Sequence, residues 1–227
     1  MSIAPALVAL TQRLADVRGR VSAACDRSGR DPGSVTLIGV SKTHPADAVA
    51  AAFEAGMRDF GENRVQEGIA KAIELRNRGL ELDWHLIGHL QTNKVRAALG
   101  TFAILHAVDS ERLLEAISGA ASAPVRVFIE VNVAAEATKF GITPAELPGL
   151  LRSARALPNI EVEGLMTVAP RVERPDEARP VFRTLRELAA ANGLSKLSMG
   201  MSDDFEVAIE EGATHIRVGR AIFGERA

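Results

Sequence analysis

The stretch VTLIGVSKTHPADAVAAAFEAG, residues 35–56, joins one predicted strand to one predicted helix. Its first part, 35–42, is apolar and rich in branched side chains until it ends on Lys42, and Pro45 then begins a helix that we expect to end at Gly56. Strands that are apolar along their length are typical of parallel sheets buried on both faces. The stretch therefore predicts a strand connected through a helix to a parallel neighbour.

Seven further strands are predicted from there to the C-terminus, each followed by a helix or the start of one. The strands are expected at 58–63, 82–88, 103–110, 125–133, 160–168, 196–201 and 215–219, and the helices at 65–75, 92–99, 111–118, 143–156, 176–192 and 204–212. Ser110 and Thr143 are predicted N-caps, with Pro144 as the first helical residue after Thr143. Eight such units fit a closed (β/α)8 barrel, whose usual size is about 250 residues. An open doubly wound sheet is the alternative fold.

An additional helix, at about residues 5–26, precedes the first strand. Leu10, Leu14, Val17 and Val21 recur in it at helical spacing, which predicts an amphipathic helix that plugs or flanks the barrel. Its apolar part is too short to span a membrane, and its arginines follow that part, unlike those of a secretory signal.

The composition is that of an ordinary globular protein, with 47% hydrophobic and 25% charged residues. A formal charge of -2 offers no basic face for nucleic acid. The single cysteine, Cys25, excludes a disulfide framework and a cysteine-based zinc site, and it favours a reducing compartment. We therefore expect one cytoplasmic domain over residues 1–227, without nucleic-acid or membrane partners.

Functional groups of a (β/α)8 barrel lie at the carboxyl ends of its strands. The last two predicted strands lead into SMGMSDD (198–204) and RVGRAIFG (217–224), which occupy the two loops that commonly bind a phosphate in such barrels. These loops combine glycines that allow close backbone approach, serine hydroxyls and the amides of a short predicted helix, namely Gly200 and Gly219, Ser198 and Ser202, and the helix beginning near Arg220.

Lys42 emerges among apolar strands at the end of the first one. Burial disfavours the charged form of an amine and lowers its pKa, which leaves a neutral nucleophile able to attack an aldehyde. A nucleophilic amine and a phosphate pocket are the two elements that pyridoxal 5′-phosphate (PLP) requires. A phosphosugar aldolase that forms a Schiff base without a cofactor needs the same two elements, so these residues leave both interpretations open.

The chain resembles the pyridoxal phosphate homeostasis protein family, of the proline synthase co-transcribed type, over nearly its whole length. The matching stretches are LIGVSKTHP, FGENRVQE, WHLIGHLQTNK, IEVNVAAEATKFGI, GLMTVAP and SMGMSDDFEVAIEEGATHIRVGRAIFG. The resemblance implies a single (β/α)8 barrel like the N-terminal domain of alanine racemase. It also implies that Lys42 forms a Schiff base with PLP.

The resemblance also implies the other cofactor-binding residues. Ser198, Ser202, Gly219 and the amide of Arg220 should line the phosphate, Arg217 should face the pyridine nitrogen, and Asn63, His85 and Met166 should line the cofactor or its mouth, with Met199 completing the set. Because arginine is a permanent cation, it should keep that nitrogen unprotonated and make the cofactor a weak electron sink. The family more often has Thr or Ser where this chain has Arg220. The chain therefore lacks one side-chain hydroxyl that would bind the phosphate, but it keeps the backbone amide.

We expect a carrier or buffer of PLP rather than a dedicated enzyme, and assign no catalytic residue and no metal site. A racemase of the alanine type takes a tyrosine base from a second domain, whereas this chain has no tyrosine and no predicted second domain. A weak racemase or lyase and the cofactor-free aldolase are the alternatives. PLP-dependent apoenzymes are the candidate recipients, and we expect a monomer rather than a dimer.

Several polar patterns are interpreted as structural. His85 and His89 are spaced like metal ligands, but they lie on a strand and a turn rather than a helix, and Asp203 and Asp204 are expected to begin a helix. Glu136 and Lys139 are expected to form a solvated pair. No role follows from the chemistry of Gln91, Asn93 and Lys94.

Overall fold

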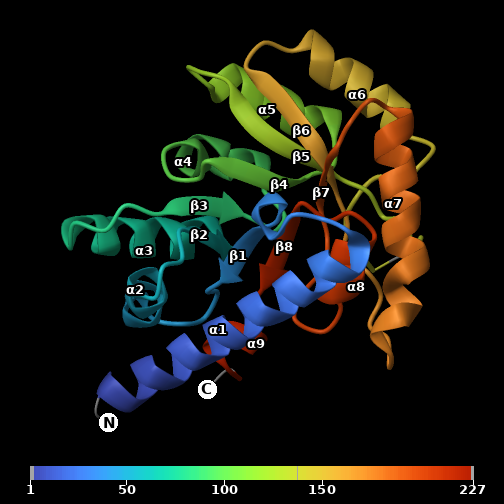
Figure 1. Cartoon of the computed structure of the whole chain (residues 1–227). Coiled ribbons are helices and arrows are strands. Elements are labelled where there is room, and N and C mark those ends of the chain that lie inside the picture. The colour runs from blue at the N-terminus through green and yellow to red at the C-terminus, as the bar shows by residue number, and fades with distance from the viewer. Residues whose placement is uncertain (1–2, 137, 226–227) are drawn as a thin grey trace.

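The protein is a closed parallel barrel with helices around it (Figure 1). The computed structural model describes residues 3–136 and 138–225, and for residues 3–7 only the backbone. The strands, in barrel order, are β1 (Thr36–Val40), β2 (Asp59–Glu62), β3 (Asp83–Leu86), β4 (Ile104–Val108), β5 (Val125–Glu130), β6 (Ile160–Met166), β7 (Lys196–Ser198) and β8 (His215–Val218). β1 pairs in parallel with both β2 and β8, which closes the sheet. The predicted (β/α)8 barrel is confirmed, and the open sheet is excluded.

The helices follow the strands in the predicted order. They are α1 (Ile3–Ser28), α2 (Ala46–Glu54), α3 (Val65–Asn77), α4 (Val95–Leu99), α5 (Glu111–Ala120), α6 (Leu147–Ala156), α7 (Arg179–Ala191), α8 (Phe205–Glu210) and α9 (Arg220–Phe223), with 3₁₀ turns η1 (Pro32–Ser34), η2 (Thr92–Lys94) and η3 (Pro175–Ala178). The Ser110 cap is confirmed, because its hydroxyl accepts a hydrogen bond from the Leu113 amide at 3.4 Å. The helix predicted at 92–99 begins as η2 and continues as α4.

The predicted cap at Thr143 is wrong, because α6 begins only at Leu147. The amide and hydroxyl of Thr143 donate to the Glu146 carboxylate at 2.8 and 2.7 Å, which makes a turn before the helix. A helix that began at Pro144 would carry Pro148 in its second turn, where proline cannot donate to the carbonyl four residues back. In the observed helix Pro148 lies within the first turn, where no such donor is needed.

The N-terminal helix α1 flanks the barrel and does not plug it (Figure 1). Leu10, Leu14, Val17 and Val21 are buried, as the helical spacing predicted. Arginines then attach α1 to the ends of neighbouring helices. Arg18 donates to the carbonyls of Ala55 and Gly56 after α2 at 3.0 and 2.9 Å, and Arg13 donates to Ile222 of α9 at 2.7 Å. Cations stabilise exposed helix carbonyls, so these arginines hold α1 in place.

The hydrophobic core is divided by the barrel wall. A large cluster fills the space between the sheet and the helices, whereas a small one, comprising Ile104, Ala107, Phe128 and Met166, lies separately. Buried polar side chains include His85, His106, Ser198, His215 and Arg217 from β3, β4, β7 and β8. No described helix is long and apolar enough to cross a bilayer.

One carboxylate ties α7 to the end of α8. Glu211 is 5% exposed at its side chain and lies 3.3, 3.0 and 2.9 Å from guanidinium nitrogens of Arg179, Arg183 and Arg186. Burial by itself raises the pKa of Glu211, but hydrogen bonds from Arg183 and Arg179 and the charge of Arg186 outweigh it and lower the pKa. Glu211 therefore contributes stability when it is ionised.

We predict that Glu211→Gln lowers the free energy of unfolding by about 1–3 kcal/mol at pH 7, measured by urea denaturation. The contribution of Glu211 to stability is fully present above the pKa that a glutamate has in the unfolded chain, about 4.3. It is lost as pH falls through the lowered pKa of Glu211 in the folded protein. The difference between variant and wild type should therefore shrink at about pH 3. Glu187→Gln, on the exposed side of α7, is the control with little effect. An equal loss for Glu211→Gln at both pH values would contradict the assignment.

Candidate functional site

A cavity of about 770 Å³ lies at the carboxyl ends of the strands. Its lining includes six of the ten residues that the sequence assigned to the cofactor: Lys42, Asn63, Ser202, Arg217, Gly219 and Arg220. Apolar side chains from the ends of β1, β3 and β6 and from the loop after β7 complete the walls, namely Val40, Ile87, Val168 and Met201. Barrel closure therefore brings the first strand and the last two loops to one site.

Lys42 follows β1, and the residue before it is held in a buried network. Lys71, on α3, donates from Nζ to the Ser41 carbonyl and to Glu62 Oε1, each at 2.7 Å. The Ser41 hydroxyl donates to the same carboxylate oxygen at 2.7 Å. Burial raises the pKa of Glu62, although Lys71 and Ser41 oppose the shift. The chain that leads into Lys42 is therefore fixed by side chains of β2 and α3.

The residue after Lys42 is fixed as well. Thr43 has φ of +67°, in the left-handed region that non-glycine residues seldom adopt. Its amide donates to Glu67 Oε1 at 2.6 Å, and Lys71 Nζ reaches the same oxygen at 2.8 Å. Burial acts to raise the pKa of Glu67, but the hydrogen bonds from Lys71 and Thr43 overcome it and the pKa is lowered. Lys71 thus bonds to both the Ser41 carbonyl and the carboxylate that holds Thr43.

Arg217, the third residue of β8, lies beneath the cavity. Its two terminal nitrogens donate to Ser198 Oγ at 2.7 Å and to the Thr167 carbonyl at 2.9 Å. Burial lowers the pKa of Arg217 to about 10, against the charges of Glu130 and Asp204, so the guanidinium is a cation at neutral pH. Burial also raises the pKa of Glu130 to about 7. The cavity therefore has a cationic, donor-only group at its floor.

Backbone loops after β7 and β8 form another wall. Gly200 has φ of +93°, and a Cβ there would lie 2.6 Å from the Cβ of Ala208, so only glycine fits this turn. Ser202 Oγ accepts from the Ala221 amide of α9 at 3.3 Å, and Arg220 forms an ion pair with Asp203. The first amides of a helix have no acceptor within it. Gly219 and Arg220, at the start of α9, therefore bring anion-binding groups to the wall.

Asn63, which lines the cavity after β2, has a buried Oδ1 that no other described group satisfies. Its backbone packs against Gly88, where a Cβ would lie 2.5 Å from the Asn63 carbonyl oxygen. A buried polar atom without a partner is costly, and such atoms in native proteins are usually satisfied by water or a ligand. Asn63 Oδ1 is therefore an available polar contact for a molecule in the cavity.

Four sequence-assigned residues do not line the cavity. Ser198 is buried and accepts a hydrogen bond from Arg217. Met166 belongs to the small core cluster, and Met199 belongs to the large one. His85 lies within β3 and lines a second pocket, among residues at the amino-terminal ends of the strands. The stretch HLIGH continues past the end of β3, so Ile87 reaches the cavity instead of His85.

Other assignments from the sequence need correction or extension. Glu136 and Lys139 do pair, at 2.7 Å, but Lys139 also donates to the carbonyls of Val168 and Ala169 at 3.3 and 2.9 Å. The pair therefore ties the loop after β5 to the cavity wall and is not merely a solvated one. Lys71 was not predicted as part of the site, and its only signal in the sequence is a lysine at helical spacing from Glu67.

The comparison with family models gives the broad class to which the barrel belongs. A family model described as alanine racemase, N-terminal domain, matches residues 14–227. The solved alanine racemase of Corynebacterium glutamicum is 20% identical with a TM-score of 0.72, covering 97% of this chain and 61% of that one. At this identity the likeness concerns the fold alone, and the chain spans about three fifths of that enzyme.

Closer relatives narrow the class. The pyridoxal phosphate homeostasis proteins of Aquifex aeolicus and Escherichia coli K12 are 44% and 40% identical over 224 and 230 residues, covering 95% and 96% of this chain and 97% of each relative. The structure of PipY from Synechococcus elongatus PCC7942 with PLP bound is 39% identical with a TM-score of 0.80, covering 95% of this chain and 100% of that one. The chain belongs to the pyridoxal phosphate homeostasis protein family.

We predict that Lys71→Met lowers the free energy of unfolding by about 3–5 kcal/mol, because it leaves the buried Glu62 carboxylate without its cation. Chemical denaturation at pH 7 measures the change. The double variant Lys71→Met/Glu62→Gln should recover part of the loss, since the uncompensated charge is then removed. Arg174→Met breaks a pair whose arginine is 82% exposed at its side chain, and it should cost less than about 1 kcal/mol. A similar small cost for Lys71→Met would contradict the network's role.

Proposed function

We propose that this protein binds PLP covalently through Lys42 Nζ and carries or buffers the cofactor without a dedicated catalytic activity of its own. The observation that carries the proposal is the cavity in which an amine just after β1, an arginine on β8 and two backbone loops meet. A relative whose structure contains bound PLP, and which this chain covers over 100% of that relative's length, supports the choice of ligand.

The residues present fit the cofactor. The cavity volume of about 770 Å³ lies within the usual range of small-molecule sites, about 300–1,000 Å³. Gly219 and Arg220 line one wall with backbone that suits a phosphate, and Lys42 supplies the amine. Asn63 Oδ1, buried and unpartnered among the described residues, offers a further polar contact. These groups match an aldehyde, a phosphate and a polar ring on one small molecule.

When bound, PLP supplies an aldehyde that attaches reversibly to an amine and a ring that withdraws electrons. Lys42 would hold the aldehyde carbon, while Ser202 and the backbone of Gly219 and Arg220 would hold the phosphate. Arg217 presents only N–H donors, so a ring nitrogen that faces it accepts a hydrogen bond and stays unprotonated. This arrangement weakens the ring as an electron sink, which suits storage better than turnover.

The chain's own composition supports a carrier. An alanine-type racemase requires a tyrosine base on the opposite face of the cofactor, and this chain has no tyrosine. The chain covers 100% of the PLP-bound relative. PLP-dependent apoenzymes as recipients, a single domain and a monomeric state are parts of the same proposal.

Covalent attachment is tested by adding PLP to the purified protein, reducing with borohydride and mapping the modified peptide by mass spectrometry. We expect a yellow protein with the label on Lys42. Lys42→Ala should lose both colour and label, and Lys94→Ala, which replaces a lysine outside the cavity lining, should keep them. A wild type that stays colourless with added PLP, or a label spread equally over all lysines, would overturn the assignment and favour the cofactor-free aldolase.

The carrier role is tested separately by mixing the loaded protein with a PLP-dependent apoenzyme. We expect recovery of the apoenzyme's activity, and no detectable racemisation or elimination when the loaded protein is incubated alone with L-alanine or L-serine. Free PLP at the same concentration is the control for simple release. Steady turnover of either amino acid by the wild type, absent in Lys42→Ala, would contradict the carrier and support the weak enzyme.

A further inference from the structure

A continuous hydrogen-bond chain runs from the cavity floor through the barrel interior. Arg217 donates to Ser198 Oγ at 2.7 Å, and Ser198 Oγ lies 2.8 Å from His106 Nδ1. His106 Nε2 lies 3.0 Å from His85 Nδ1, and His85 Nε2 lies 3.1 Å from Asp59 Oδ1. The first four of these residues are buried, so the chain is shielded from solvent until it reaches Asp59.

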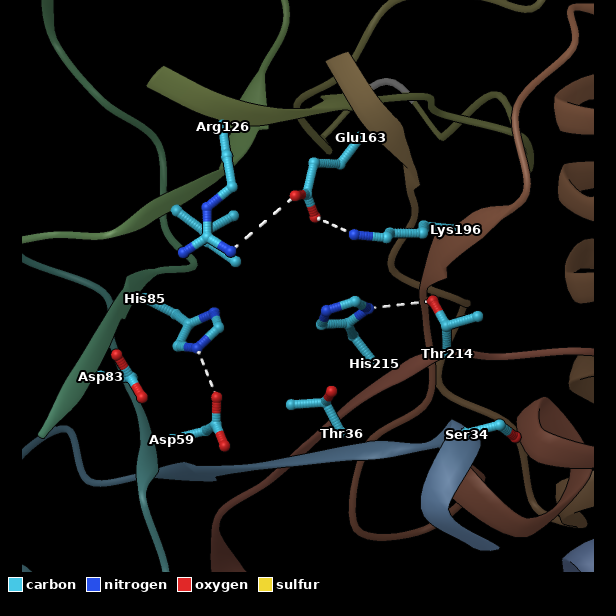
Figure 2. Close-up of a pocket in the computed structure, with 11 residues that line it drawn as sticks. Ser34, Thr36, Asp59, Asp83, His85, Arg126, Glu163, Lys196, Thr214 and His215 are labelled. Atoms are coloured by element: carbon cyan, nitrogen blue, oxygen red, sulfur yellow. Dashed lines mark hydrogen bonds and ion pairs between the residues drawn. The ribbon is translucent and has the colours of Figure 1, made fainter. Parts of the chain in front are cut away.

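The far end of the chain opens into a second cavity, of about 430 Å³. We call it the amino-terminal chamber, because it is lined by residues at or near the starts of the strands, among them Thr36, Asp59, Asp83, Lys196 and His215. Figure 2 shows Asp59 directed at the His85 ring, with Asp83 nearby and joined to nothing drawn. The Asp59 side chain is 33% exposed. A partly solvated carboxylate thus ends the chain opposite the cofactor cavity.

The chemistry of the two ends sets the direction of every hydrogen bond between them. Arg217 only donates, and a carboxylate such as Asp59 only accepts. Burial, together with the charges of His85, His215 and Arg217, lowers the pKa of His106 well below its usual range, so His106 is neutral at pH 7. A neutral imidazole has one donor and one acceptor nitrogen.

Starting from Asp59, the assignments follow in order. His85 Nε2–H donates to Asp59, and His85 Nδ1 accepts from His106 Nε2–H. His106 Nδ1 is then an acceptor, and the Ser198 hydroxyl donates to it. The Ser198 oxygen is left to accept from Arg217. Each link carries one hydrogen, and every donor has an acceptor.

The reversed direction fails at Ser198. If His106 donated from Nδ1, Ser198 Oγ would receive N–H groups from both His106 and Arg217, and its own proton would need a third partner. Within residues 3–136 and 138–225, His106 and Arg217 are the hydrogen-bond partners of this hydroxyl. A buried hydroxyl proton without an acceptor costs free energy. The observed contacts therefore favour the direction set by Asp59.

We propose that Asp59, in the amino-terminal chamber, is a positioning residue for Arg217 at the cofactor cavity, and that it acts by fixing the hydrogen-bond direction of His85, His106 and Ser198. With the chain oriented this way, Ser198 and the Thr167 carbonyl hold the two terminal nitrogens of Arg217. The effect on PLP rests on the proposed function. The tautomers of the two histidines do not, and they are a property of the protein alone.

The first test is ¹⁵N NMR of histidine-labelled protein without cofactor, at pH 7. The chain contains five histidines, so the ring nitrogens can be assigned with His85→Asn and His106→Asn. We expect His106 to carry its proton at Nε2 and to be bare at Nδ1, with His85 Nδ1 as the acceptor of the His106 Nε2–H. Protonation of His106 at Nδ1 would overturn the proposal, and the tautomers themselves are read from the wild type once its ring signals are assigned.

The second test compares Asp59→Ala with Asp83→Ala, a matched carboxylate of the same chamber that makes no hydrogen bond to another described residue. Only Asp59→Ala should change the His106 nitrogen shifts. It should also shift the visible band of bound PLP and weaken PLP binding by about tenfold, since a charge-assisted hydrogen bond to Arg217 is loosened. Identical His106 shifts in Asp59→Ala and wild type would overturn the proposal. A wild type that binds no PLP would refute the proposed function but leave the NMR result standing.

Discussion

The pairing of β1 with β8 is the constraint on which the site depends. These strands are the first and last of the sheet, and their register sets Ile38 beside Arg217 and Gly39 beside Val218. The carboxyl ends of parallel strands lie on the same side of a sheet, so this pairing brings Lys42, which follows β1, to the same cavity as the loop after β8. In an open sheet with the strands in this order, β1 and β8 would be the two outermost strands, and the amine would be far from the phosphate loops.

Closure also creates an interior that this protein fills partly with polar groups. Burying histidines, a serine and an arginine is costly unless each is hydrogen-bonded. His106, Ser198 and Arg217 satisfy one another, and the Lys71 network does the same beside β1. Such networks specify geometry rather than add much stability. Each of the two groups proposed to contact the cofactor is positioned by one of these networks: the Lys71 network holds the residues beside Lys42, and Ser198 bonds to Arg217.

Alanine racemase structures share the fold at low identity and extend well beyond the length of this chain. In this chain Lys139 ties the loop after β5 to the cavity wall after β6.

The sequence by itself determined the alternation of eight strands with helices and the positions of Lys42 and the two glycine-containing loops at the carboxyl ends of strands, because periodicity, Pro and Gly positions and motif blocks are local signals. It overextended strands at 125–133 and 196–201, which end at Glu130 and Ser198, since apolar residues beyond a strand end also pack. Only the tertiary structure decided at which depth of the barrel each side chain lies: Ile87, beyond the end of β3, reaches the cavity, whereas His85, two residues earlier, lines the amino-terminal chamber. That depth depends on where each strand ends and how it tilts in the barrel, and contacts such as those of Lys71 with Ser41 or Asp59 with His85 join strands and helices distant in sequence.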